Sequence, residues 1–352
     1  MTLDELTHST GEWLRGVGSY SDVVISSRIR LARNLASVPF LSTATAEERT
    51  DIYQTLVKEI SAVSNDGKTL LVDIDSAEAI DRHLLVERHL ISRQHAAAEG
   101  SRGVSISSTE TLALMINEED HLRIQCLRSG LQLETLLEEI SAIDDLVEQG
   151  VPYAFDKQFG YLTACPTNVG TGIRVSVMLH LPGLKMTGEI ERVFRAARDM
   201  RLAIRGLHGE GTDAIGDFFQ VSNQTTLGLS EEDIVREFGG DIIRRLVDYE
   251  MSARETLANE QPYQLDDKIY RAYGVLSNVR MIGTDESLYL LSNLRLGVQT
   301  KRFKAVGLDT LNELFLLTQR AHLQRINGGA MDGAQRAVAR AELFRKKLAP
   351  NG

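Results

Sequence analysis

Apolar positions recur with helical spacing in two long segments of the first half of the chain. Residues 46–63 have an apolar side chain every three or four positions, which predicts an amphipathic helix. This stripe consists of Ile52, Leu56, Val57 and Ile60. Residues 131–149 repeat the pattern with Leu133, Leu136, Leu137, Ile140 and Ile143. We therefore expect two amphipathic helices here.

Around these helices, short β-branched or alternating runs predict strands. They lie at residues 23–25, 111–117, 122–127 and 173–181. The second and third runs are separated only by an acidic turn, so we expect them to be adjacent strands. This order favours an antiparallel sheet over a βαβ repeat. We therefore expect an α+β fold in which helices flank an antiparallel sheet.

The last third of the chain is helical in pattern. Ser230 precedes three acidic residues and then two apolar ones, as at a capped helix N-terminus. Further helical patterns occupy residues 242–256, 268–276, 285–296, 310–320 and 333–347. The composition changes near Pro262, where we place a domain boundary.

Three parts of the chain are expected from these patterns. A leader spans residues 1–21, and its Trp13 and Leu14 should pack on the body of the protein. A mixed α+β domain spans residues 22–254. An all-helical C-terminal domain follows at residues 260–352.

Composition and charge narrow the possible functions. The 352-residue chain has a formal net charge of −10, 43% apolar residues and 25% charged residues. An acidic chain is poorly suited to general binding of nucleic acid or anionic membranes, which needs a positive surface. The two cysteines, Cys126 and Cys165, are too few for a disulfide scaffold and have no metal-ligand spacing. Because no signal-peptide or transmembrane pattern is present either, we expect a cytoplasmic protein.

Three segments place arginines beside small, polar or acidic residues. They span residues 26–33, 117–123 and 165–174. Guanidinium groups match phosphate oxygens, and several of them brought together favour a polyanion such as a nucleoside triphosphate. Glu119 and Cys165 are then candidates for handling the group that receives the phosphate. The pattern indicates a phosphotransferase, although each arginine taken alone could equally face solvent.

Two glycine-rich segments add to this interpretation. Gly170 and Gly172 adjoin Arg174, where glycine allows the backbone to approach a phosphate. Residues 205–213 resemble segments that close over a substrate and bring in a carboxylate. A tight turn and a surface loop are the ordinary alternatives. His89 could stack on a base or pack against the helix around it. The sequence has no Walker A loop and no protein-kinase signature.

Taken together, these segments resemble the phosphagen (guanidino) kinase family, which includes the arginine and creatine kinases. The resemblance covers residues 22–252 and rests on Arg-Ile-Arg at 28–30, on the acidic turn at 117–123 and on Cys-Pro-Thr-Asn-x-Gly-Thr-Gly-x-Arg at 165–174. No counterpart of the small helical domain that precedes the catalytic domain of metabolic members is recognised. An extra C-terminal helical domain and the segment 204–210 are similar to those of the bacterial protein-arginine kinases.

The resemblance implies a site for ATP. Its residues would be Ser26, Ser27, Arg28, Ile29, Arg30, His89, Arg123, Arg174, Val175, Ser176, Val177, Met178, Arg205, Gly206, Leu207, His208, Gly209 and Glu210. In the family the histidine lies near the adenine and the arginines hold the phosphates. Mg²⁺ would bridge those phosphates, and no metal site made of protein side chains is implied.

The same resemblance implies the catalytic groups. Glu119 would orient the substrate guanidinium and accept its proton, with Glu210 as its partner and Cys165 as a thiolate close to the guanidinium. Asp213 remains an alternative to Glu210, because the alignment of that segment is ambiguous by three residues. A guanidinium is a poor nucleophile with a pKa above about 12, so carboxylates that hold it and remove a proton make the chemistry coherent.

One C-terminal stretch departs from the protein-arginine kinases. They have an Arg-Asp-x-x-Arg-Ala segment that binds phosphoarginine, and here the stretch at 336–341 has Ala337 in place of the aspartate. Arg336 and Arg340 are therefore candidate phosphoarginine ligands. A plain amphipathic helix is the alternative.

We therefore predict an ATP-dependent protein-arginine kinase. The resemblance further implies a homodimer formed through a regulatory helical domain, protein substrates with exposed arginines, a zinc-binding activator protein and a Clp ATPase. Its substrates would be marked for Clp-type proteolysis, and a stress repressor would be relieved. A phosphagen kinase acting on a free guanidino compound and a non-catalytic adaptor that binds phosphoarginine are the two alternatives.

Overall fold

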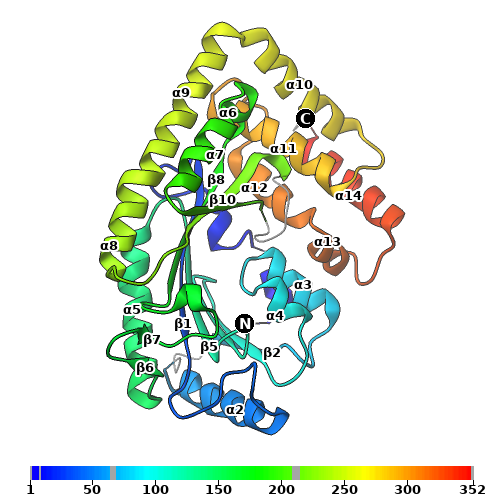
Figure 1. The fold of residues 1–352 in the computed structure, drawn as a ribbon. Coiled ribbons are helices and arrows are strands. Elements are labelled where there is room, and N and C mark those ends of the chain that lie inside the picture. Colours follow the sequence, from blue (N-terminus) through cyan, green and yellow to red (C-terminus); the bar gives the residue numbers. More distant parts are fainter. Residues whose placement is uncertain (1, 8, 64–68, 208–214, 350–352) are drawn as a thin grey trace.

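A large antiparallel sheet lies at the centre of the computed structural model, which describes residues 2–7, 9–63, 69–207 and 215–349 (Figure 1). Its strand order is β2-β3-β4-β5-β1-β8-β10-β9, and every neighbouring pair is antiparallel. The strands are β1 (Val24–Arg33), β2 (Thr69–Asp73), β3 (Gly103–Ser107), β4 (Leu112–Ile116), β5 (Leu122–Ser129), β8 (Ile173–His180), β9 (Leu202–Arg205) and β10 (Phe218–Asn223). The predicted α+β fold is confirmed. The sequence pattern had not identified β2, β3, β9 and β10.

One face of the sheet is covered by the amphipathic helices. They are α2 (Ala46–Val63), α5 (Leu133–Gly150), α8 (Glu231–Val235), a π-helical segment (Arg236–Ile243) and α9 (Arg244–Glu260), and Figure 1 shows α5, α8 and α9 along one side. Ile29 and Leu31 of β1 are fully buried in this core together with apolar residues of α2 and α5. The helix predicted at 46–63 is confirmed over its whole length.

The opposite face is only partly covered. Helices α1 (Leu3–Leu6), α3 (Ala79–Glu87) and α4 (Arg93–Ala97) pack on the β2–β4 side through a small core of their own. A second core joins the 3₁₀ turn Glu12–Leu14 to the C-terminal helices. Trp13 and Leu14 are buried in it, as predicted for the leader. The uncovered middle of this face is left for a cavity.

The C-terminal region is all helical. It contains α10 (Pro262–Asn278), α11 (Thr284–Gln299), α12 (Leu308–Leu317), α13 (Arg320–Ile326) and α14 (Gly333–Leu348). The predicted end of the helix at 310–320 was wrong. Gln319 has extended backbone dihedrals, so α12 ends before it and α13 begins after it. Helices α6 (Pro182–Met186) and α7 (Ile190–Asp199), a two-stranded β6–β7 hairpin (Phe155–Asp156, Gly160–Tyr161) and the 3₁₀ turns Pro166–Asn168 and Ile215–Asp217 complete the described elements. No helix in the described ranges has the length and apolarity needed to cross a membrane.

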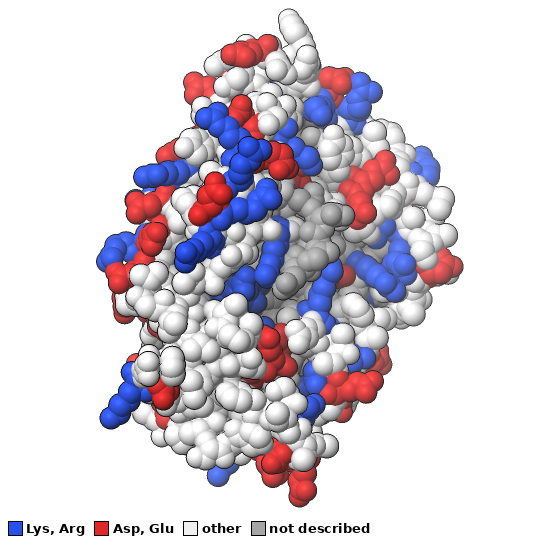
Figure 2. Space-filling model, viewed as in Figure 1, with Lys and Arg blue, Asp and Glu red and all other residues white. Residues whose placement is uncertain are grey.

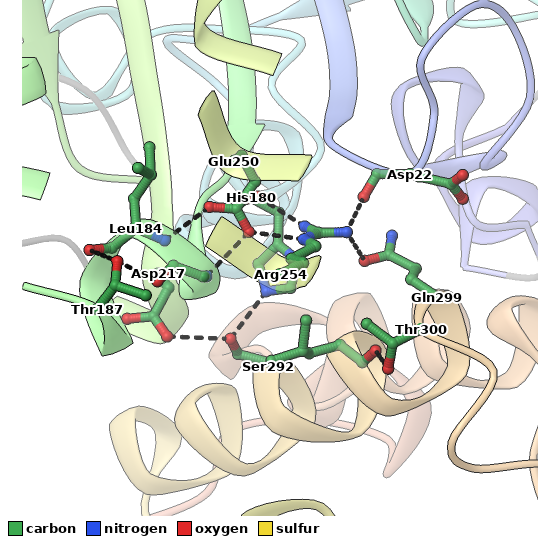
Figure 3. A network of polar contacts seen from close by, with 12 residues as sticks. Asp22, His180, Leu184, Thr187, Asp217, Glu250, Arg254, Ser292, Gln299 and Thr300 are labelled. Carbon is green, nitrogen blue, oxygen red and sulfur yellow. Dashed lines mark hydrogen bonds and ion pairs between the residues drawn. The ribbon is translucent and has the colours of Figure 1, made fainter. Parts of the chain in front are cut away.

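A buried polar network attaches the C-terminal helices to the sheet (Figure 3). Arg254 of α9 lies at its centre, and its Nε donates to Glu250 at 2.6 Å. The same guanidinium donates to the backbone oxygens of Asp22 at 3.0 Å and His180 at 3.1 Å, and to the side chain of Gln299 of α11 at 3.1 Å. One arginine thus joins the segment directly before β1, the end of β8, α9 and α11.

A second contact in this network reaches β10. His180 Nε2 and Ser292 Oγ of α11 lie 2.8 Å apart, and Ser292 donates to Asp217, which directly precedes β10, at 3.3 Å. Asp217 also accepts from Lys185 at 2.6 Å. Helix α11 is therefore anchored to the ends of both β8 and β10.

Candidate active site

Strand alternation turns the arginines toward the uncovered face of the sheet. Successive side chains of a strand point to opposite faces, so Arg28 and Arg30 lie opposite the core residues Ile29 and Leu31. The register then sets the neighbours, because Arg30 of β1 pairs with Arg174 of β8 and Ala32 pairs with Arg123 of β5. Three distant segments of the sequence thus contribute guanidinium groups to one surface.

These side chains line a cavity of about 1010 Å³. Of the residues predicted to form the site, its wall contains Arg28, Arg30, His89, Glu119, Arg123, Cys165, Arg174 and Arg205. Figure 2 shows Lys and Arg side chains gathered in the middle of the face viewed in Figure 1. A site rich in guanidinium groups within an acidic chain fits an anionic ligand.

Electrostatics favour a polyanion in this cavity. Burial, reinforced by Arg174, Arg123 and Arg205, lowers the pKa of Arg28 to about 10. Burial and the neighbouring arginines also lower the pKa of Arg30 well below its ordinary value. These shifts mean that the clustered positive charge is unfavourable by itself, and phosphate oxygens between the arginines would relieve it.

Hydrogen bonding of the arginines supports the same ligand. Arg28 donates to Ser176 at 3.3 Å and to Gln220 at 2.8 Å, and Arg174 donates to Ser222 at 3.1 Å. By contrast, the Nε of Arg30 is buried and has no hydrogen-bond partner among the described residues. A buried donor without a partner is costly, so this group is suited to receive a phosphate oxygen.

The two glutamates of the acidic turn between β4 and β5 have different environments. Glu118 is buried and ion-paired with Arg123 at 2.7 Å, and it accepts from Ser92 at 2.5 Å. Although burial opposes its ionisation, Arg123 and Ser92 hold the pKa of Glu118 below its usual value. The side chain of Glu119 is 37% exposed to solvent and lies 3.2 Å from Arg123. Burial raises the pKa of Glu119, which suits a proton acceptor facing the cavity.

Asp120 connects this turn to the cysteine segment. Its fully buried carboxylate accepts from the backbone N–H of Ala164 and from the side-chain amide of Asn34, both at 2.7 Å. Glu119 precedes Asp120, and Cys165 follows Ala164. One hydrogen bond therefore holds the two predicted catalytic groups on adjacent segments of the same cavity wall.

Cys165 lies at the start of the 3₁₀ turn Pro166–Asn168 and is partly exposed. Its sulfur is 3.0 Å from the hydroxyl of Thr167. Gly172, farther along the same segment, has φ of 68°, and a Cβ atom there would lie 2.7 Å from the carbonyl oxygen of Ala32. Glycine is thus required for this segment to lie against β1. By contrast, Cys126 is buried in the sheet core, where burial raises the pKa of its thiol to about 12.

His89 lies at another side of the cavity and does not belong to a helix, contrary to the expectation that a helix surrounds it. Helix α3 ends at Glu87, and His89 has φ of 59° in the left-handed region. Its ring and the Trp13 ring form a T-shaped pair with a centroid distance of 4.4 Å. Gln125 of β5 donates to its carbonyl oxygen at 2.7 Å.

The remaining predicted site residues divide into three groups. Ser26, Ser176 and Met178 line a narrow extension of the cavity beside His89. The side chains of a second group point away from the cavity into the protein interior, and they are Ser27, Ile29, Val175, Val177 and Leu207. Gly206 does not line it either. His208, Gly209, Glu210 and Asp213 lie outside the described residues. Strand alternation explains the members of the second group on β1 and β8, because a continuous run such as 174–178 alternates between the two faces of the sheet. Leu207 follows β9 and is buried in the core that contains Trp13.

Arg336 and Arg340 lie on α14 and do not line the cavity. Arg340 is buried and donates to the carbonyl oxygens of Thr318 and Ile282, both at 2.8 Å. Arg336 donates to the carbonyl oxygen of Met331. Both guanidinium groups thus have backbone partners in this structure.

Several residues of the cavity wall had not been identified from the sequence. They are Ser92, Arg93, Gln94, Asn168, Arg201, Gln220, Gln224 and Thr225. Gln220 lies on β10, and Arg201 directly precedes β9, so their role depended on strands that the pattern had not predicted. Residues 219–222 alternate apolar and polar and could have identified Gln220, but four alternating residues in a strand buried on both faces are a weak signal.

The fold and the cavity together define a phosphotransferase of the guanidino-kinase class. Residues 51–253 match the ATP:guanido phosphotransferase family in its C-terminal catalytic domain, and residues 262–351 match the protein-arginine kinase McsB C-terminal domain. The chain therefore belongs to the ATP:guanido phosphotransferase family and, within it, to the protein-arginine kinases. The predicted family resemblance is confirmed.

Similar proteins support both levels of this assignment. The protein-arginine kinase of Symbiobacterium thermophilum is 44% identical over 97% of this chain and 98% of its own, and that of Bacillus licheniformis is 43% identical over 97% and 94%. The crystal structure of lombricine kinase matches with a TM-score of 0.59 and 25% identity, over 69% of this chain and 70% of its own. The duplicated taurocyamine kinase of Schistosoma mansoni matches with a TM-score of 0.60 over 77% and 41%, and at 23% identity it shows the shared fold.

Proposed function

We propose that this protein transfers the γ-phosphoryl group of ATP to the guanidinium group of arginine residues in proteins. The observation that carries the proposal is the single cavity in which four arginines from β1, β5 and β8 meet Glu119 and Cys165. Arg28, Arg30, Arg123 and Arg174 would neutralise the nucleotide phosphates. No group of three or more His, Cys, Asp or Glu side chains in the described ranges is placed to hold a metal ion, so Mg²⁺ would bind mainly through those phosphates.

Glu119 would act on the acceptor. Its carboxylate would orient the guanidinium and take one N–H proton as the bond from nitrogen to the γ-phosphorus forms and the bond to the β,γ-bridging oxygen breaks, releasing ADP. Cys165, held beside Glu119 by the Asp120–Ala164 hydrogen bond, would pair as a thiolate with the cationic acceptor. Glu210, with Asp213 as the alternative, would supply the second carboxylate.

Partners follow from the same proposal. Protein substrates would present exposed arginines, with a zinc-binding activator protein and a Clp ATPase as further partners in the degradation of marked proteins. Homodimer formation through the helical region is favoured by exposed aromatic side chains on α10, where Tyr263 is 88% and Tyr270 55% exposed. The domain division at residues 22–254 and 260–352 is part of this proposal.

The test is incubation of the purified protein with Mg-ATP and casein, in parallel with free L-arginine. Acid-labile, alkali-stable phosphate is then mapped by mass spectrometry under non-acidic handling. Phosphoarginine on casein and none on the free amino acid is the expected result. Product only on the free amino acid would instead identify a phosphagen kinase. No product on either, with intact binding of Mg-ATP, would favour a non-catalytic adaptor.

A further inference from the structure

A three-residue segment joins the nucleotide cavity to the C-terminal helices. Glu87, Arg88 and His89 follow one another at the end of α3, and His89 lines the cavity. The Glu87 carboxylate accepts the backbone N–H groups of Ala321 at 2.7 Å and His322 at 3.0 Å, in the first turn of α13. It also lies 2.8 Å from Nδ1 of the His322 ring. The catalytic part of the chain thus holds the start of α13.

Arg88, the middle residue, is fully buried. Its Nε and Nη2 form a bidentate pair with Glu110 at 2.8 and 2.6 Å, and its guanidinium also donates to Ser9. Its Nη1 lies 3.2 Å from Nε2 of His322. Since a guanidinium only donates, the His322 Nε2 must accept, and Nδ1 therefore carries the proton that it donates to Glu87. One neutral imidazole bridges Glu87 and Arg88.

The bridge through His322 matters for His89 because the backbone of His89 has an unfavourable conformation that its neighbours must hold in place. A φ of 59° is uncommon outside glycine and persists where the surroundings hold it. The preceding residue is fixed by Glu110, Ser9 and His322. The ring of His89 packs on Trp13, whose ring lies 5.9 Å from that of Phe315 in α12. Helices α12 and α13 therefore both contact residues that in turn contact or directly precede His89.

We propose that Glu87 and His322 are positioning residues for the nucleotide site, so that α13 of the C-terminal region holds the His89 wall in its binding geometry. This inference rests on the proposed function, since it assigns the cavity to a nucleotide. Neither residue touches the cavity itself. Their effect passes through Arg88, and loss of the bridge should act on nucleotide affinity more than on the chemical step.

The test compares variants of the full-length chain by isothermal titration with Mg-ADP, by melting temperature and by the kcat and KM for ATP with casein as acceptor. His322→Leu and Glu87→Gln should each raise the Kd for Mg-ADP and the KM for ATP by about tenfold, the effect of losing one buried hydrogen bond to a charged group. The kcat at saturating ATP should change by less than about threefold. His322→Gln, whose amide can both donate and accept, should recover most of the affinity.

Arg325→Ala is the matched control. Arg325 lies on the same helix and pairs with Asp4 at 2.9 Å and Asp81 at 3.2 Å. Among the described residues, its side-chain ion pairs do not involve Arg88 or Glu87. This variant should bind Mg-ADP like the wild type even where its melting temperature falls.

Three outcomes would overturn the inference. The first is an unchanged Kd for Mg-ADP in both His322→Leu and Glu87→Gln. The second is equal weakening in Arg325→Ala, which would indicate general destabilisation. The third is a fall in kcat without a change in KM. If His322→Leu does not fold, Glu87→Gln and His322→Gln provide the same comparison. A wild-type protein that does not bind Mg-ADP would instead contradict the proposed function itself.

Discussion

Asp120 offers a direct test of how the acceptor side of the cavity is built. Its Oδ1 accepts two hydrogen bonds at 2.7 Å, from Asn34 and from the backbone of Ala164. Asp120→Ala removes the acceptor from both donors, although the Asn34 amide keeps its bond to the carbonyl oxygen of Leu162 at 3.1 Å. A buried donor left without a partner costs about 1–3 kcal/mol, so the free energy of unfolding should fall by about 2–6 kcal/mol.

Asp120→Asn separates the acceptor from the charge. Its Oδ1 can keep both hydrogen bonds, while its amide nitrogen replaces Oδ2, a buried atom that has no hydrogen-bond partner among the described residues. The loss should therefore be smaller, about 1–3 kcal/mol. Melting followed by the fluorescence of Trp13, the only tryptophan, gives the order of stability.

Activity should follow the same order for a different reason. Glu119 and Cys165 each adjoin one end of the Asp120–Ala164 hydrogen bond, and a displacement of about 1 Å at a reacting group costs roughly 100-fold in rate. The kcat for phosphoarginine formation on casein, measured well below the melting temperature, should fall about 100-fold in Asp120→Ala and less than about tenfold in Asp120→Asn. A normal kcat in a destabilised Asp120→Ala protein would refute the positioning argument. Equal damage in both variants would show that the charge of Asp120, and not its hydrogen bonds, matters.

Four further changes test the assigned roles. Glu119→Gln should abolish transfer while Mg-ADP binding persists, and loss of Mg-ADP binding by titration would contradict its role at the acceptor. Burial raises the pKa of Glu119 above 4.5, and a base acts only when it is deprotonated, so the rate of transfer by the wild type should fall as the pH drops through that raised pKa. A transfer rate that does not change down to pH 4.5 would exclude this carboxylate as the base. Glu118→Gln should weaken Mg-ADP binding by about tenfold, since Arg123 loses its partner at 2.7 Å, and unchanged affinity would show that Arg123 is held by other contacts. Cys165→Ser should lower kcat with casein, and full activity would assign Cys165 a structural role.

Helices with long apolar stripes were predictable from the sequence, and several strands were not. Helix α2 covers the predicted residues because an 18-residue amphipathic pattern has a single favourable period. The strand β10, in contrast, is buried along its whole length, and only Phe219-Gln220-Val221-Ser222 alternates apolar and polar residues. So short an alternation is a weak periodic signal, and the pairing of short strands is decided by neighbours distant in the sequence.

The candidate site was likewise predictable from the sequence only in part. Eight of the site residues predicted from the motifs lie on one cavity wall. The motifs did not distinguish the side chains that face the cavity from those that face the core within one segment. Strand alternation makes this distinction, because it assigns Val175 and Val177 to the core and Arg174 to the cavity. The different environments of Glu118 and Glu119 depend on the turn between β4 and β5, where Asn117 has φ of 59°. That turn geometry lies beyond what an acidic run predicts.

The helices that follow the predicted boundary near Pro262 share a hydrophobic core with the residues that precede it. The core that contains Trp13, Met178 and Phe218 is completed by apolar residues of α10, α11, α12 and α14, so a chain ending before α10 would expose it. Helix α11 binds the ends of β8 and β10 through Ser292, and α13 binds α3 through His322. These two attachments lie on different elements of the cavity wall. The helical region therefore supports two elements of the cavity wall, although none of its described side chains lines the cavity.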